Sequence, residues 1–243
     1  MTADAPAALR ARLDEGTPAQ PGMDYIPVRW AEWIDDLGVV TLPMDGPRAS
    51  IDRAQMCAFV HEHVDARPVD AFVTVLQWGY GTGGRGPSRA RKMLTGGLHD
   101  AARARAYDPT VADKLAESVA VARTGDPREA YLQLARGSGK ISGFGPAFFT
   151  KWLYAVSAQG DPRAATALPI LDELLQTWIA RESGTELRYG DADDYARYVD
   201  ILDAWAAEAG AARIDVELAI FTLERERRRA ASRARRLASC AQD

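Results

Sequence analysis

Apolar residues recur every three or four positions along most of the chain, which is the spacing of one face of an α-helix. Trp30, Ile34 and Leu37 illustrate this pattern in the N-terminal part. Alternation of apolar and polar residues, the pattern of a half-buried strand, never extends beyond four residues. We therefore predict an all-α fold. The expected helices cover residues 25–40, 50–64 (with Ser50 as N-cap), 70–78, 113–123, 129–135, 146–158, 191–209 and 215–226, and a further helix begins at Asp172.

Composition changes near both ends of the sequence and predicts three parts. Residues 1–24 are rich in Ala, Pro, Gly and Thr and are interpreted as a loose N-terminal leader. Residues 25–226 form the helical domain, and residues 227–243 form an arginine-rich C-terminal tail. Seven arginines lie between residues 225 and 236, where we expect an exposed helix that frays. Such a charge run is usually a solvated surface, and nonspecific contact with DNA is the alternative.

Four glycines lie within residues 137–145 and separate two predicted helices. Gly143 and Gly145 predict a tight turn, because glycine enters the φ > 0 region freely. Pro146 follows in the first turn of the next helix, where its missing N–H costs nothing. The segment 137–151 is therefore expected to form a helical hairpin whose free N–H groups and positive dipole end could hold an anion. A plain turn between two helices is the alternative interpretation.

A second glycine-rich segment, residues 79–86, contains five glycines. We predict a flexible loop there, with an unstructured connector as the alternative. The basic side chains that accompany it are candidate phosphate contacts: Arg85, Arg89 and Arg91. Trp78 directly precedes this segment, and Tyr80 is its second residue. Either aromatic ring could stack on a base or wedge into a duplex. A tryptophan in such a position is also typical of the core, which is the alternative for Trp78.

Composition limits the possible chemistry further. The apolar fraction of 47% is ordinary for a globular protein, and a net charge of −4 does not by itself indicate a nucleic-acid-binding protein. Cys57 and Cys240 are too few for a disulfide framework or a four-thiolate cluster. The three histidines have no metal-ligand spacing (His61, His63 and His99), so no metal or cofactor is expected. Without a signal peptide or an apolar run of 18 residues, we expect a cytoplasmic protein that does not contact a membrane.

Residues 170–172 have the sequence apolar-apolar-Asp and begin a predicted helix. Asp172 lies 27 residues after Gly145. Together with the hairpin, this arrangement resembles the helix–hairpin–helix DNA glycosylase superfamily. Lys151 on the hairpin helix and the Trp-Gly-Tyr-Gly sequence at residues 78–81 add a resemblance to a bacterial family with the 8-oxoguanine glycosylase fold. The resemblance covers roughly residues 50–225.

One position departs from the pattern of the 8-oxoguanine glycosylase branch of this superfamily. Its catalytic lysine lies two residues after the second hairpin glycine, and Ala147 occupies this position here. Lys151 comes one helical turn later, on about the same face of the helix. A mechanism that relies on Asp172 without a lysine nucleophile therefore stays open.

The resemblance implies an all-α glycosylase fold with a cleft between two helical subdomains. It also implies that the partner is double-stranded DNA with a damaged or modified base, 8-oxoguanine first, which is rotated out and cleaved at its C1′–N bond. Asp172 would stabilise the positive charge on the sugar, and a neutral Lys151 could attack C1′ and form a Schiff base that permits strand cleavage. The DNA backbone would contact Lys140, Gly143 and Gly145 of the hairpin and Arg85, Arg89 and Arg91. A monomer is expected by the same resemblance.

Two other interpretations fit the same residues. The chain could be a catalytically inactive DNA-binding module in which Asp172 is only a helix cap and Lys151 only a solvated lysine. It could also be a glycosylase directed at modified foreign DNA, such as phage DNA. The first alternative can be separated from an enzyme by geometry, because catalysis requires both side chains in one cleft.

Overall fold

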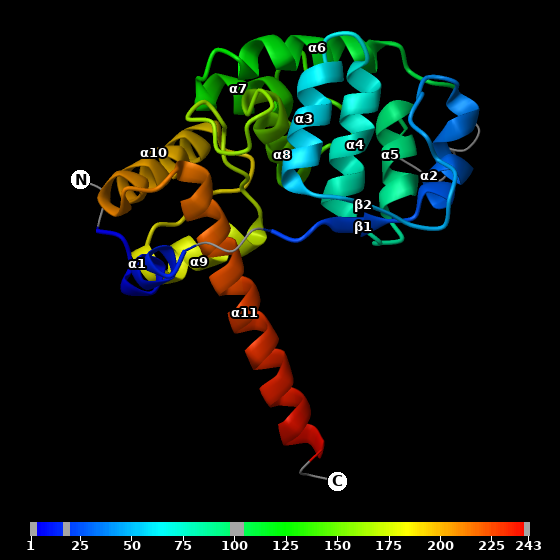
Figure 1. Cartoon of the computed structure of the whole chain (residues 1–243). Coiled ribbons are helices and arrows are strands. Elements are labelled where there is room, and N and C mark those ends of the chain that lie inside the picture. The colour runs from blue at the N-terminus through cyan, green and yellow to red at the C-terminus, as the bar shows by residue number, and fades with distance from the viewer. Residues whose placement is uncertain (1–3, 17–19, 98–104, 241–243) are drawn as a thin grey trace.

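The computed structural model describes residues 4–16, 20–97 and 105–240. Over these ranges the chain forms eleven α-helices, one 3₁₀ helix and a two-stranded antiparallel sheet, so the predicted all-α fold is confirmed (Figure 1). The elements in chain order are α1 (Ala7–Asp14), β1 (Met23–Tyr25), α2 (Pro27–Ile34), η1 (Asp35–Leu37), β2 (Ala49–Ile51), α3 (Arg53–His63), α4 (Pro68–Tyr80), α5 (Gly86–Leu94), α6 (Thr110–Ala122), α7 (Pro127–Ala135), α8 (Pro146–Ser157), α9 (Glu173–Ser183), α10 (Ala192–Ala209) and α11 (Arg213–Cys240).

Aspartate caps fix the starts of several helices. The aspartate before each of α7, α9 and α10 accepts hydrogen bonds from two N–H groups of the first turn, an interaction worth about 1 kcal/mol. Helix α3 begins with a capping box. Asp52 accepts from the N–H of Gln55 at 2.8 Å, and the Gln55 side chain accepts from the N–H of Asp52 at 2.9 Å. The expectation that Ser50 caps this helix is wrong, because Ser50 lies in β2 and Asp52 satisfies the free N–H groups.

The helices pack in two groups. In one group α3, α4, α6, α7 and α8 pack on one another and α5 packs on α2 and α4; in the other, α1, α9 and α10 pack on α11 (Figure 1). Helix α7 contacts α10 and joins the two groups. Phe72 of α4 packs edge-to-face against Phe144 of the hairpin and Trp152 of α8, with ring centroids 5.0 and 6.0 Å apart. This aromatic packing attaches the hairpin to the core.

The N-terminal stretch interpreted as a loose leader contains ordered structure in its described part. Helix α1 packs against α11, and its Leu9 is fully buried. The backbone N–H of Ala5 donates to Glu208 at 2.8 Å, and Arg12 forms an ion pair with Glu226 at 2.7 Å. Contacts with α10 and α11, about 200 residues away, therefore order this stretch, although its own sequence has little helical periodicity. Residues 1–3 and 17–19 of the stretch lie outside the described residues.

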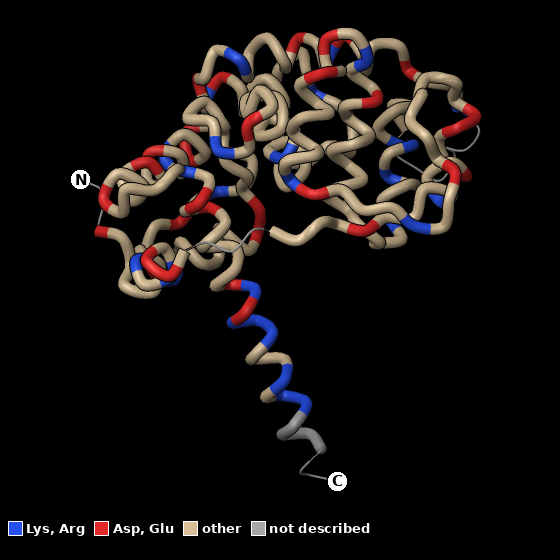
Figure 2. Tube along the Cα trace, viewed as in Figure 1, with Lys and Arg blue, Asp and Glu red and all other residues tan. Residues whose placement is uncertain are grey.

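Helix α11 passes through the expected boundary between domain and tail without a break. It packs against α1, α9 and α10 and then extends away from the body of the molecule (Figure 1). Arginines follow one another along this extension, as Figure 2 shows. None of the described helices is both long enough and apolar enough to cross a bilayer.

Candidate active site

The predicted hairpin consists of α7, a turn and α8. The N–H of Phe144 donates to the carbonyl of Ile141 at 3.1 Å, and Gly143 has φ +81°, which is the arrangement of a type II turn. Pro146 occupies the first position of α8, as predicted. Gly145 caps α8 with an ordinary φ of −87°, so the expectation that this glycine serves positive φ does not hold.

Close packing or a positive φ explains why some hairpin positions are glycine, but neither explains Gly145. A Cβ on Gly137 would lie 2.8–2.9 Å from atoms of Gln133, so close packing requires glycine there. Gly143 is required by its positive φ. A Cβ on Gly145 would meet no atom within 4 Å. The fold of the free chain therefore gives no reason for glycine at residue 145.

Lys151 reaches back along α8. Side chains in a helix lean toward its N-terminus, and the Lys151 Nζ donates a hydrogen bond to the carbonyl of Ala147 at 2.7 Å. The ammonium also lies 5.3 Å from the centroid of the Phe148 ring. The amine of Lys151 is thus brought to the helical turn of Ala147, where the resemblance places the catalytic lysine.

Gly79 makes room for this side chain. A Cβ on Gly79 would lie 3.1 Å from Cδ of Lys151 and 2.9 Å from Cε1 of Phe148. The Tyr80 ring stacks on the Phe148 ring, with their centroids 4.0 Å apart. The predicted eight-residue loop is therefore too long, because Gly79 and Tyr80 end α4 and Gly86 begins α5.

The environment of Lys151 shifts the pKa of its amine downward. Burial lowers the pKa of Lys151, and the nearby guanidinium of Arg53 acts in the same direction. The negative charges of Asp172 and Glu217 oppose this effect without reversing it. A lysine amine must be neutral to act as a nucleophile, so the direction of the shift suits that role.

Asp172 is the N-cap of α9, as predicted. Its Oδ1 accepts hydrogen bonds from the N–H groups of Leu174 and Leu175 at 2.9 and 3.2 Å. The other carboxylate oxygen, Oδ2, has no hydrogen-bond partner within the described ranges. Capping therefore occupies only half of the carboxylate.

Buried side chains hold the extended segment that leads to Asp172. Three N–H groups of this segment donate to a serine, a glutamate and a threonine, and two of its carbonyls accept from tyrosine hydroxyls. The bonds are Leu168 to Ser157 (2.8 Å), Ile170 to Glu217 (2.8 Å), Leu171 to Thr150 (3.2 Å), Tyr195 to Pro169 (2.7 Å) and Tyr198 to Ile170 (2.7 Å). Because Thr150 precedes Lys151 on α8, this network also sets the position of Asp172 relative to Lys151.

Lys151 and Asp172 line the same cavity, which has a volume of about 200 Å³. Trp78 and Gly79 of α4 and Glu217 of α11 also line it. Both groups form hydrogen bonds to backbone atoms: the Lys151 amine donates to the carbonyl of Ala147, and the Asp172 carboxylate accepts from the first turn of α9. Both side chains therefore lie at one cavity, as catalysis by the pair would require.

A buried ion pair forms part of the wall of this cavity. The sequence alone does not predict it. Arg53 pairs with Glu217 at 2.9 Å and donates from Nε to Gln20 at 3.0 Å. Its guanidinium also lies over the Trp78 ring, 5.4 Å from the centroid. Arg53 and Glu217 are 164 positions apart, and neither belongs to a local motif.

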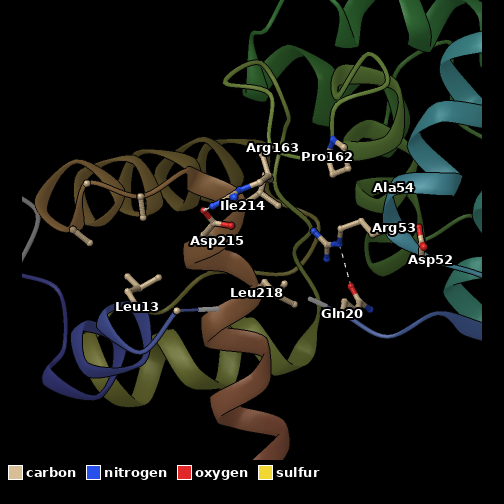
Figure 3. Close-up of a pocket in the computed structure, with 14 residues that line it drawn as sticks. Leu13, Gln20, Asp52, Arg53, Ala54, Pro162, Arg163, Ile214, Asp215 and Leu218 are labelled. Atoms are coloured by element: carbon tan, nitrogen blue, oxygen red, sulfur yellow. Dashed lines mark hydrogen bonds and ion pairs between the residues drawn. The ribbon is translucent and has the colours of Figure 1, made fainter. Parts of the chain in front are cut away.

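A larger cavity, of about 540 Å³, lies between α1, α3 and α11 (Figure 3). Arg53 and Gln20 line both cavities, and Figure 3 shows the hydrogen bond between them. Neither Lys151 nor Asp172 reaches the larger cavity. Arg53 and Gln20 thus stand between it and the cavity that holds the predicted chemistry.

The predicted phosphate contacts divide into two kinds. Lys140, Arg85 and Arg89 are exposed. Arg91 is buried instead, where it pairs with Asp36 and donates to a backbone carbonyl of α2 at 2.6 Å. The assignment of Arg91 to the DNA backbone is therefore wrong, because α5 packs against α2 and its arginine serves that packing.

The two predicted wedge residues are not exposed. Trp78 is 3% exposed and lines the smaller cavity, and Tyr80 is half-buried in its stack on Phe148. In the described residues no group of three or more His, Cys, Asp or Glu side chains is arranged to hold a metal ion. His99 lies outside the described residues.

The sequence interpretation missed Tyr189, whose side chain is unusually exposed for an aromatic residue, at 46%. Burial of the hydroxyl and the charge of Asp172 raise the pKa of the Tyr189 phenol to about 12, against a smaller effect of the Ala147 N–H. Tyr189 is therefore close enough to Asp172 and to the start of α8 to interact with both. Its only sequence signal is an aromatic residue in a polar segment.

A protein-family comparison matches residues 16–221 to the OGG family, described as "Putative 8-oxoguanine DNA glycosylase OGG-like protein". The matched range includes the hairpin, Lys151, Asp172 and the buried ion pair. Neither the comparison with curated proteins nor the comparison with solved structures found a match.

Proposed function

Because the chain belongs to the OGG family of 8-oxoguanine DNA glycosylase-like proteins, we propose that it is a DNA glycosylase that removes an oxidised or modified base, with 8-oxoguanine as the first candidate. One observation carries the proposal: Lys151 and Asp172 line a single cavity, and burial lowers the pKa of the lysine. The cavity is smaller than the roughly 300–1,000 Å³ of drug-sized sites, in keeping with one extruded base.

In the proposed reaction the neutral Lys151 amine attacks C1′ of the extruded nucleotide, and the C1′–N bond breaks. The base leaves with the bonding electrons and takes up a proton, while the attacking amine loses one. Asp172 Oδ2 accepts that proton and, earlier, stabilises the positive charge on the sugar. Ring opening then gives a Schiff base between the lysine and the sugar, and β-elimination from it cleaves the strand.

Binding to the duplex is assigned to the hairpin and the exposed cations. Gly145 has room for a side chain and an ordinary φ, which supports close approach of a phosphate as the reason for glycine there. Lys140, Arg85 and Arg89 are exposed and would contribute salt-dependent phosphate contacts. Tyr189 would meet the duplex beside the hairpin helix.

The proposal is tested with a duplex that contains one 8-oxoguanine. The wild-type chain is expected to release the base, and Asp172→Asn is expected to lose this activity. Asparagine caps helices about as well as aspartate, so this variant keeps α9 intact and isolates the charge. Asp126→Asn, at the cap of α7, is the matched control and should retain full activity. Base release by Asp172→Asn at the wild-type rate would contradict the assigned role.

Borohydride trapping tests the lysine separately. A Schiff base between Lys151 and the sugar would be reduced to a stable protein–DNA adduct, which Lys151→Met could not form. Base release without any adduct in the wild type would mean that Asp172 activates water and that the enzyme is monofunctional. If neither 8-oxoguanine nor a panel of modified-base duplexes, including modified cytosines, is processed, the enzymatic proposal is wrong.

A further inference from the structure

The extension of α11, residues 225–236, is here named the arginine arm. It carries seven arginines and, after Glu226, no acidic residue. Figure 1 shows that this part of α11 leaves the body of the molecule beside α9, and Figure 2 shows basic positions recurring along it. The family match ends at residue 221, so the arm lies outside the part of the chain shared with the family.

The arm begins at the wall of the proposed active site. Glu217, Phe221 and Arg225 follow one another at intervals of four residues and all line the smaller cavity. The Arg225 guanidinium lies over the Phe221 ring, 6.0 Å from its centroid. Continuing the same spacing leads to Arg229 and Arg233. The basic surface is therefore a direct continuation of the cavity wall.

Most charges of the arm are not neutralised within the molecule. Glu224 is fully buried and pairs with Arg227 at 2.7 Å and Arg228 at 3.0 Å, which secures the base of the arm. Four other arginines form no ion pair with any part of the chain that the structure describes: Arg225, Arg229, Arg233 and Arg235. Like charges four residues apart on a helix are destabilising, so a bound polyanion would stabilise the arm.

The spacing of the arginines without an ion pair in the described chain is comparable to that of the phosphates along one DNA strand. Residues 225–236 span about 17 Å of helix, so these four arginines give roughly one positive charge per 4 Å. One strand of a DNA duplex carries one negative charge per about 3.4 Å of its axis. Beyond Arg228 the described arm contains only Ala, Ser and Arg as far as Arg236. It therefore has no apolar face to insert into a membrane surface.

We propose that the arginine arm binds the phosphate backbone of the duplex that flanks the extruded nucleotide. The inference rests on the proposed function, because it takes the cavity as the site of that nucleotide. The arm would add affinity without sequence preference and would leave the chemical step to Lys151 and Asp172. It extends the DNA-contacting surface beyond the hairpin to a part of the chain that the family match does not include.

The test compares the full-length wild-type chain with a triple variant, Arg229→Gln, Arg233→Gln and Arg235→Gln. Gln and Arg have similar helix propensities, so the arm should remain helical by circular dichroism. Binding to an undamaged duplex is measured over a series of salt concentrations. Each lost phosphate contact lowers the magnitude of the slope of log K against log salt by about 0.9, so a decrease of roughly 2–3 is expected. The corresponding triple Lys variant preserves the charges and should keep the wild-type slope.

The two proposals fail in distinguishable ways. An unchanged salt slope in the Gln variant, with base release intact in the wild type, would refute the arm and leave the glycosylase standing. A reduced slope with no base release from any duplex would support the arm and refute the glycosylase. If the slope is unchanged but binding to vesicles of phosphatidylserine and phosphatidylcholine is lost, the arm binds membranes and the proposal is wrong.

Discussion

The hydroxyl of Thr150 accepts a hydrogen bond from the backbone N–H of Leu171 at 3.2 Å, and these two residues immediately precede Lys151 and Asp172. The same hydroxyl bonds the carbonyl of Pro146 at 2.8 Å. One buried side chain therefore connects the helix that carries the amine to the segment that carries the carboxylate. The separation of the two groups is set by this connection and not by a bond between them.

We expect Thr150→Val to uncouple the two groups. The N–H of Leu171 would be left buried without a partner, at a cost of about 1–3 kcal/mol in the free energy of unfolding. Base release at saturating DNA should fall together with stability, whereas Thr150→Ser keeps the hydroxyl and should retain both. Thermal unfolding and single-turnover kinetics measure the two effects. Wild-type stability in the Val variant would show that the hydrogen bond does not secure the segment.

Gly79→Ala should displace Lys151 without unfolding the protein. The new methyl would lie 3.1 Å from the lysine Cδ and 2.9 Å from the Phe148 ring, so both side chains must move. Helix propensity favours alanine by up to about 1 kcal/mol, which offsets part of the overpacking cost. The readout is the yield of borohydride-trapped adduct, which should decrease. Gly84→Ala is the matched control, since its Cβ would meet no atom within 4 Å, and an equal decrease in both variants would refute the specific role of Gly79.

Alanine substitutions at Gly143 and Gly145 should have different effects, the first on stability and the second on DNA binding. Gly143→Ala forces a side chain into φ +81° and should destabilise the fold by about 1–2 kcal/mol. Gly145→Ala has ordinary φ and open space, so its unfolding temperature should stay at or above that of the wild type. If a phosphate approaches Gly145, this second variant should nevertheless bind DNA more weakly. Wild-type affinity in Gly145→Ala, measured at one fixed salt concentration, would exclude that contact.

The pH dependence of stability should reveal the buried lysine. Burial lowers the pKa of Lys151 in the folded state, so the unfolded state binds more protons between this lowered pKa and the ordinary lysine value of about 10.4. The free energy of unfolding contributed by this group therefore rises with pH across that window, and below it the buried charge destabilises the fold. We expect Lys151→Met to unfold at a higher temperature than the wild type at pH 7, with a difference that shrinks as the pH approaches 10. A difference that does not depend on pH would contradict the lowered pKa.

Local signals were sufficient for the hairpin and for the start of α9. Predicted helices at residues 129–135 and 146–158 correspond to Pro127–Ala135 and Pro146–Ser157. Proline at the first helical position and glycine in a turn act through their own backbone, so the sequence reveals them directly. The cap at Asp172 is also local, because its carboxylate bonds N–H groups two and three residues later.

The features that could not be predicted depend on distant partners. The run of glycines predicts a loop that includes Gly79, whereas in the structure Gly79 lies in the last turn of α4 and packs closely against Phe148. Arg91 follows a glycine-rich segment and so resembles a phosphate ligand in sequence, but the packing of α5 on α2 pairs it with Asp36. The pairing of Arg53 with Glu217 follows only from the tertiary fold. A charged side chain is assigned to solvent, to an ion pair or to a ligand by its neighbours in space, which residue type alone does not specify.

The cavity takes its walls from both ends of the described chain, with Gln20 and Met23 on the N-terminal side and Phe221 and Arg225 on α11. During translation at about 5–20 residues per second, α11 would be completed as far as Arg225 roughly 3–11 s after Asp172 has been added. Until then a nascent chain lacks the wall that Phe221 and Arg225 contribute to this cavity. The cavity shared by Lys151 and Asp172 is therefore completed only when the last described helix has been made, so the candidate site is among the last parts of the fold to form.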